Sequence, residues 1–133
     1  MKKNTDAGLL LIRLSIGLLM LLHGLAKLSG GINFIKGMVS QLGLPQFLAY
    51  GVFVGEILAP IAIIIGIRTR LASALFAINC LVAIFMAHSN DIFSLGKHGG
   101  WAIELLGLYL FGALALFFTG GGKYAFSKNN IWD

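Results

Sequence analysis

Six ionisable residues stand within or at the edge of long apolar stretches of this sequence, where charge is expensive. They are Arg13, His23, Lys27, Glu56, His88 and Glu104. A charged side chain at the centre of a bilayer costs about 2.5–3.5 kcal/mol on insertion scales, so such residues usually face the interior of a helix bundle and mark a site. Carboxylates and imidazoles exchange protons and bind polar groups, so these six residues point to that chemistry.

Glu56 is the strongest single candidate. Its side chain is too short to reach the membrane surface from its depth, and Pro60 follows four residues later. Proline lacks the amide that would bond the carbonyl of residue 56, so the helix is weakened beside a buried acid. We expect Glu56 to face the bundle interior and to contact a basic or polar group of another helix, with His23 the favoured partner.

The composition indicates that these residues belong to a membrane protein. Of the 133 residues, 58% are apolar and 11% are charged, and the mean hydropathy is +0.90. A soluble domain averages about 25% charged residues, so this chain cannot cover a water-facing surface. The net charge of +5 lies largely in short connections, which indicates membrane topology rather than nucleic-acid binding. The single cysteine, Cys80, excludes a disulfide framework, and we expect it to serve in packing.

Four apolar runs predict four transmembrane helices. They cover residues 7–28, 47–67, 71–89 and 100–119. At 1.5 Å per residue each run is about 28–33 Å long, which matches the hydrocarbon core. Segments in lipid must satisfy their own backbone, so we predict an all-α bundle of four helices forming one domain over residues 1–133. Arg13 interrupts the first run and no A-x-A site follows it, so we expect a retained helix rather than a signal peptide.

Basic residues predict the orientation of the bundle. The side that holds both termini carries Lys2, Lys3, Arg68, Arg70, Lys123 and Lys128. The other side carries Lys27, Lys36 and Lys97. The positive-inside rule therefore places both termini in the cytoplasm and His23, Glu56, His88 and Glu104 in the outer half of the membrane. Arg13 lies toward the cytoplasmic half.

The first connection contains a further helical pattern. Apolar residues recur at helical spacing over residues 32–42, with polar residues between them, and Gly43 and Pro45 follow. This pattern predicts a short amphipathic helix that lies on the outer surface and ends at the glycine and proline. Its place above the polar residues makes it a candidate lid.

Simpler interpretations exist for several of these residues. Lys27 can extend to the interface, and Arg13 can reach the cytoplasmic headgroups. His88 and His98 can be boundary residues of a loop, and Trp101 suits an interfacial anchor. These interpretations stay open beside the functional ones.

The sequence resembles the DoxX family of small four-helix membrane proteins over nearly its whole length. The resemblance rests on Arg13, on His23-Gly24-x-x-Lys27-Leu28, on Leu42-Gly43-x-Pro45, on Glu56, on Gly66-x-Arg68-Thr69-Arg70 and on Gly120-Gly121-Gly122-Lys123-Tyr124. The family usually has proline where this chain has Gly121, and its ending differs from Ala125-Phe126-Ser127, which leaves the subgroup open. The resemblance implies a bacterial plasma-membrane protein. One branch of the family resembles a subunit of a thiosulfate:quinone oxidoreductase, and other members are associated with oxidative-stress complexes.

Our leading hypothesis is a component of a quinone-linked redox system. His23, Glu56 and Glu104 are the candidate catalytic residues. The candidate ligand-binding residues are Lys27, His88, Trp101 and Arg13. The sequence has no metal-ligand set, flavin motif, iron–sulfur cysteines or nicotinamide fingerprint. Electrons would therefore come from a soluble or membrane oxidoreductase subunit or from a diffusible reductant. Assembly as a homo-oligomer is also open.

Three alternatives use the same residues. The chain can be a non-catalytic membrane anchor or assembly subunit whose polar cluster fixes helix packing. It can be a small transporter or ion path with Glu56 as the ion site, although no inverted repeat is evident. His23 and His88 can be considered as haem ligands, but their expected depths differ by several ångströms, which argues against haem.

Overall fold

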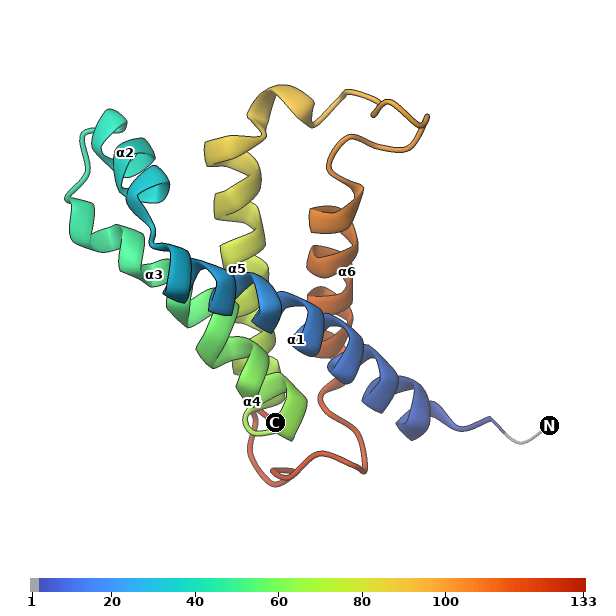
Figure 1. The fold of residues 1–133 in the computed structure, drawn as a ribbon. Helices are drawn as coiled ribbons and strands as arrows, with labels where there is room; N and C mark the ends of the chain where they lie inside the picture. The colour runs from blue at the N-terminus through green and yellow to red at the C-terminus, as the bar shows by residue number, and fades with distance from the viewer. Residues whose placement is uncertain (1–2) are drawn as a thin grey trace.

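Four apolar helical segments build the bundle, as predicted, in the computed structural model, which describes residues 3–133 (Figure 1). They are α1 (Thr5–Gly30), the run Gln46–Ile65, α5 (Thr69–Ala87) and α6 (Glu104–Thr119). The first three are long and apolar enough to cross a membrane, and α6 is a shorter apolar helix. Lys2, one of the basic residues that predict the orientation, lies outside the described residues.

The second segment changes its winding along its length. It begins as the 3₁₀ turn η1 (Gln46–Tyr50) and continues as α3 (Gly51–Phe53), the π-helical turn η2 (Val54–Leu58) and α4 (Ala59–Ile65). Pro60 is the second residue after the π turn, so the helix is irregular where the sequence predicted a weak point. In the π turn the amide of Ala59 donates to the carbonyl of Val54.

The fourth segment begins later than predicted. Helix α6 begins at Glu104 rather than at Gly100. The chain before it folds back on itself, because the amide of Ala102 donates to the carbonyl of Ser94 at 3.0 Å and Leu95 pairs with Trp101 in an isolated bridge. These non-helical hydrogen bonds replace the first helical turn that hydropathy alone suggested.

The predicted amphipathic helix is present as α2 (Asn33–Gln41). It ends at Gln41, and Leu42 caps it before Gly43, whose φ of 72° lies in the left-handed region that favours glycine. Its inward side packs through Val39, which joins Ile32 and Ala49 in a small buried cluster. Together with the connection 88–103, α2 forms one end of the molecule, which we call the distal end (Figure 1).

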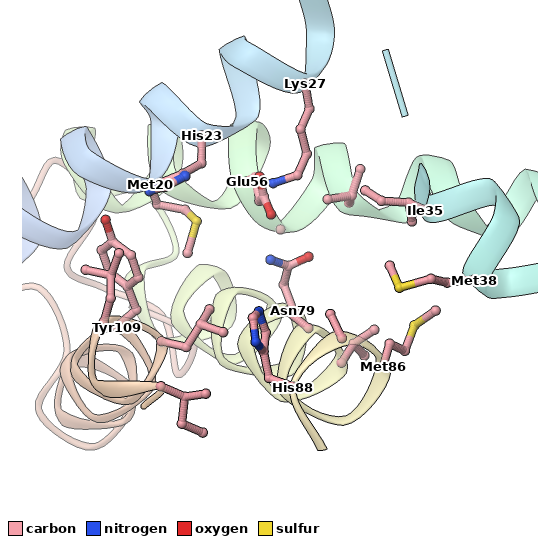
Figure 2. A pocket seen from close by; sticks show the side chains of 18 of the residues that line it. Met20, His23, Lys27, Ile35, Met38, Glu56, Asn79, Met86, His88 and Tyr109 are labelled. Atoms are coloured by element: carbon pink, nitrogen blue, oxygen red, sulfur yellow. Dashed lines mark hydrogen bonds and ion pairs between the residues drawn. The ribbon is translucent and has the colours of Figure 1, made fainter. Parts of the chain in front are cut away.

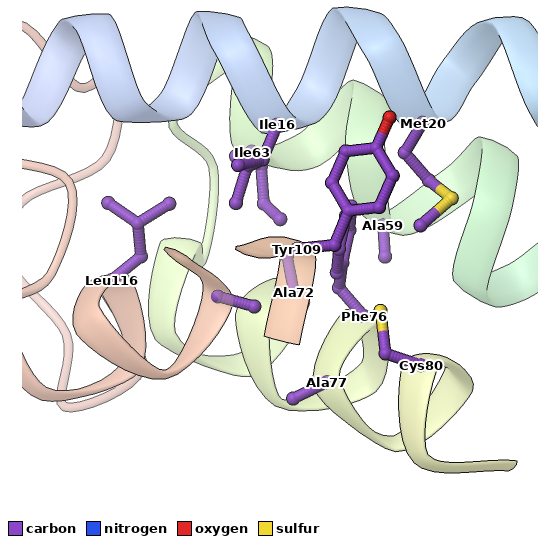
Figure 3. Packing of buried hydrophobic residues seen from close by; sticks show 11 residues of the cluster. Ile16, Met20, Ala59, Ile63, Ala72, Phe76, Ala77, Cys80, Tyr109 and Leu116 are labelled. Carbon is purple, nitrogen blue, oxygen red and sulfur yellow. The ribbon is translucent and has the colours of Figure 1, made fainter. Parts of the chain in front are cut away.

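The close-packed core occupies the other half of the bundle. Buried residues of four helices meet there, among them Ile16, Ile63, Phe76, Ala113 and Leu116 (Figure 3). Cys80 is fully buried in the same cluster, where it packs as a small apolar side chain, as expected.

The carboxyl-terminal segment 120–133 folds over the turn between α4 and α5, and we call this the tail end (Figure 1). The carbonyl of Trp132 accepts hydrogen bonds from the amides of Arg70 and Leu71, which α5 itself leaves unpaired. The carboxylate of Asp6 accepts a hydrogen bond from the amide of Lys123 at 2.9 Å. Both ends of the chain therefore lie on one side of the bundle, and their cytoplasmic placement stays a prediction.

Candidate functional site

A cavity of about 1000 Å³ opens among the helices at the distal end. The ends of α1, the second segment, α5 and α6 form its walls, and α2 covers one side of it (Figure 2). Apolar side chains dominate the lining, and a few polar groups converge within it. This combination is typical of sites for lipophilic ligands that carry a polar head.

An ion pair in the cavity wall joins the first two transmembrane segments. Lys27 Nζ donates to Glu56 Oε2 at 2.5 Å. The Glu56 side chain is 8% exposed, whereas the Lys27 side chain is 31% exposed. Glu56 therefore faces the interior and contacts a basic group of another helix, as predicted.

Local backbone features bring this pair together. Glu56 lies in the π turn, and a Cβ at Gly24 would clash with the Glu56 carbonyl. The absence of a side chain at Gly24 lets α1 approach the irregular turn closely, and Lys27 follows one helical turn later on the same side of α1. The motif His23-Gly24-x-x-Lys27 therefore allows the close contact between the helices and also provides the lysine of the ion pair.

The prediction that His23 is the partner of Glu56 was wrong. His23 is mainly exposed, and its ring lies edge-on to Tyr109, with 6.2 Å between the ring centroids. The flexible lysine chain reaches the carboxylate, whereas the short imidazole one turn earlier contacts the phenol instead. His23 still lines the cavity.

Two polar residues of the cavity lining were not predicted from the sequence. The amide of Asn79 on α5 points into the cavity between Glu56 and His88 (Figure 2). Its side chain lies against Gly55, where a Cβ would not fit. Tyr109 on α6 is buried and lines the cavity beside His23. A lone amide or phenol inside an apolar run was the signal that could have identified them.

The remaining candidates at this end lie at the rim of the cavity. His88 ends α5, and its Nδ1 lies 3.3 Å from Asp91 Oδ2. Glu104 is exposed at the first turn of α6, with its carboxylate folded against Gly100. Trp101 Nε1 donates to the carbonyl of Ile92 at 2.7 Å, and its ring covers Gly107. All three line the cavity, as does the loop residue His98.

Comparison with known proteins identifies the family. The family profile described as DoxX matches residues 8–89, which is more than half of the chain and includes the ion pair and Asn79. The chain belongs to the DoxX family. No solved structure matches it with significant similarity.

Two curated relatives extend this assignment of the DoxX protein. It is 33% identical over 84 residues to the Bacillus subtilis (strain 168) protein named "Putative oxidoreductase CatD", a match that covers 63% of this chain and 62% of the relative. It is 30% identical over 134 residues to the Escherichia coli (strain K12) "Inner membrane protein YqjF", covering 99% of this chain and all of that relative. The chain thus spans less than two thirds of the first relative and the whole of the second.

Arg13 of this DoxX protein lies away from the cavity, in the tail half. The residue is 1% exposed, and its guanidinium donates to the carbonyls of Ile63, Ile64 and Gly121 at 2.8, 2.8 and 3.1 Å. Arg13 therefore does not line the cavity with the other candidates. Backbone oxygens of α4 and of the tail surround its guanidinium instead.

The arrangement supports binding and proton exchange at one place. Lys27 and Asn79 offer hydrogen-bond donors, and Glu56 offers an acceptor that can take up a proton. These groups share a largely apolar cavity, where a polar head can displace water and exchange hydrogen bonds directly with the protein.

Proposed function

We propose that this DoxX protein is the membrane component of a quinone-linked redox system and that the distal cavity binds a quinone-like lipophilic ligand. The observation that carries the proposal is the Lys27–Glu56 ion pair, which lies in the wall of an otherwise largely apolar cavity. The pair borders open space in which a polar head group could reach both charged side chains.

The residues present fit a quinone head group. A quinone supplies two carbonyl oxygens that accept hydrogen bonds and take up protons when the ring is reduced. Lys27 and Asn79 would donate hydrogen bonds to these oxygens, and Glu56 would hold or release a proton beside them. Tyr109 and His23, which lie side by side in the cavity wall, would contact the ring from one side with their aromatic side chains.

Electrons would enter from a second protein or from a diffusible reductant, because the sequence carries no fingerprint for a flavin or a nicotinamide. The name of the Bacillus subtilis relative, "Putative oxidoreductase CatD", supports this assignment to redox chemistry. In this proposal the chain binds and orients the lipophilic partner of the reaction and manages its protons.

Quinone content tests the proposal directly. We expect quinone to co-purify with the wild-type protein in gentle detergent, measured by solvent extraction and mass spectrometry. Glu56→Gln should fold but retain about a tenth of the quinone or less, because it removes the ion pair and the exchangeable proton. Asp6→Asn is the matched control, because Asp6 lies at the tail end, outside the cavity lining, and asparagine can still accept the hydrogen bond from the amide of Lys123.

Equal quinone in Glu56→Gln and wild type would contradict the proposed site. Absence of binding even after a quinone is added would contradict the proposed function. That second result would favour the alternative of a non-catalytic anchor or assembly subunit, which needs the helices but no ligand.

A further inference from the structure

The cavity consists of two chemically different parts. A polar chamber lies between Lys27, Glu56 and Asn79 (Figure 2). An apolar arm extends from it beneath α2, between Ile35, Met38 and Met86 (Figure 2). We infer that the apolar arm binds the hydrocarbon tail of the ligand and so fixes the direction in which the ligand lies; this inference rests on the proposed function.

The lining of the arm suits a flexible chain. Met38 on α2 and Met86 on α5 face each other across it (Figure 2). Thioether side chains have several rotatable bonds and adapt to irregular apolar partners. Ile35 and Val52 complete the surface without adding a polar group. A polar head would lose its hydrogen bonds there, whereas each methylene of a tail gains by burial.

The arm also leads toward the lipid. Phe34 on α2 and Phe47 on η1 expose 74% and 68% of their surfaces. Aromatic and apolar residues on the free side of an amphipathic helix are covered by the acyl region of a bilayer. A tail lying beneath α2 would therefore continue into the membrane, while the head stays beside Glu56.

The opposite direction is less suitable for a tail. Beyond the chamber the cavity meets the distal connection, where Lys97, His98 and Glu104 form a polar rim. That side suits water and protons. We therefore assign the polar head of the ligand to the chamber, its hydrocarbon tail to the apolar arm and proton exchange to the polar rim.

Photoaffinity labelling tests this orientation with two probes. Both are benzoquinones with a decyl tail, and they carry a diazirine either at the tail end or on the ring. In nanodiscs, the tail probe should label residues 33–41 and the end of α5 around Met86. The ring probe should label residues around Glu56 and Asn79. Peptide mass spectrometry locates the adducts.

Matched variants test the role of the arm. Met38→Trp fills the arm and should lower labelling by the tail probe about tenfold. Leu42→Trp adds the same side chain at an exposed position just after α2 and should leave labelling unchanged. Thermal unfolding of both variants verifies that they fold.

The outcomes separate the two proposals. Ring labelling near Glu56 with tail labelling on α1 or α6 would overturn the orientation and leave the proposed function standing. Tail labelling unaffected by Met38→Trp in a folded protein would also overturn it. Saturable labelling absent from both probes would overturn the proposed function itself.

Discussion

Two cations on the same helix have opposite surroundings in this molecule. Arg13 in the tail half is 1% exposed and donates to three backbone carbonyls. Lys27 at the distal end keeps 31% of its side chain exposed and donates to one carboxylate, at the edge of a large cavity. A buried cation surrounded by backbone oxygens holds a structure together, whereas a cation paired with an acid in open space can exchange partners with a ligand.

The backbone around Arg13 also differs from the backbone around Lys27. In the tail half, regular helix meets the folded tail, and the core is close-packed (Figure 3). At the distal end, the π turn lies close against α1, and a cavity opens between these segments, α2 and the late start of α6. The tail half is therefore the close-packed part of the molecule, and the distal end is the part that contains the cavity.

Removing Arg13 should cause the largest loss of stability. Arg13→Met leaves the carbonyls of Ile63, Ile64 and Gly121 without their donor, and each buried unsatisfied group costs about 1–3 kcal/mol. We expect a strongly lowered melting temperature in detergent, or failure to accumulate. Arg68→Met is the control at the same end, because its pair with Asp133 is exposed on the arginine side and such pairs contribute about 0–1 kcal/mol. Equal melting temperatures for the two variants would refute the structural role of Arg13.

Widening the contact between α1 and the π turn should have the next largest effect. Gly24→Ala places a Cβ against the Glu56 carbonyl, so the helices must separate, at a cost of about 1–3 kcal/mol. Gly8→Ala on the same helix meets no atom within 4 Å and should be neutral or stabilising. Thermal unfolding compares the two. If Gly24→Ala is as stable as Gly8→Ala, the close approach does not hold the site together.

Unpairing the distal ion pair should cost less than removing Arg13. Glu56→Leu leaves the Lys27 ammonium without its partner, but that side chain is partly exposed and can reach water, so we expect a loss of about 1–2 kcal/mol. The double variant Lys27→Met/Glu56→Leu should recover most of it, because apolar replacement of a whole buried pair is often neutral. Further destabilisation of the double variant would show that the pair is structural, like Arg13.

The smallest expected effect is on the pH dependence of stability at the tail end. The Ser127 hydroxyl donates to Asp133 Oδ1 at 2.7 Å, and this bond, with the amide of Asn130 and with Arg68, lowers the pKa of Asp133. A lowered folded-state pKa stabilises the docked tail above the pKa of the unfolded chain, and that contribution is lost as the pH falls through the folded value. Asp133→Asn should flatten this acid-side dependence in a pH series of melting temperatures. An unchanged series would exclude Asp133 from tail docking.

Much of the architecture followed from local features of the sequence. The apolar runs defined the spans, Pro60 indicated the irregular turn at Glu56, and the pattern over residues 32–42 predicted α2. Hydropathy missed the late start of α6, since the hydrogen bonds of the loop before it join residues several positions apart.

The contacts between helices were harder to predict. Helical spacing places His23 and Lys27 on one side of α1, but only the separation and rotation of the helices decide which of them reaches Glu56. The environment of Arg13 depends on Gly121, which is distant in sequence and arrives with the folded tail. Asn79 was visible as an amide in an apolar run, but its direction depended on its contact with Gly55.

The most direct test of the central claim measures ligand binding after the charges are removed without loss of the fold. Trp101 lines the cavity, so its fluorescence in a Trp132→Phe background should be quenched as decylubiquinone is added to the purified protein. We expect saturable quenching in this background and none in the Lys27→Met/Glu56→Leu variant, although that variant should unfold at nearly the same temperature. Equal quenching in both proteins would contradict the claim that the distal ion pair is a binding site.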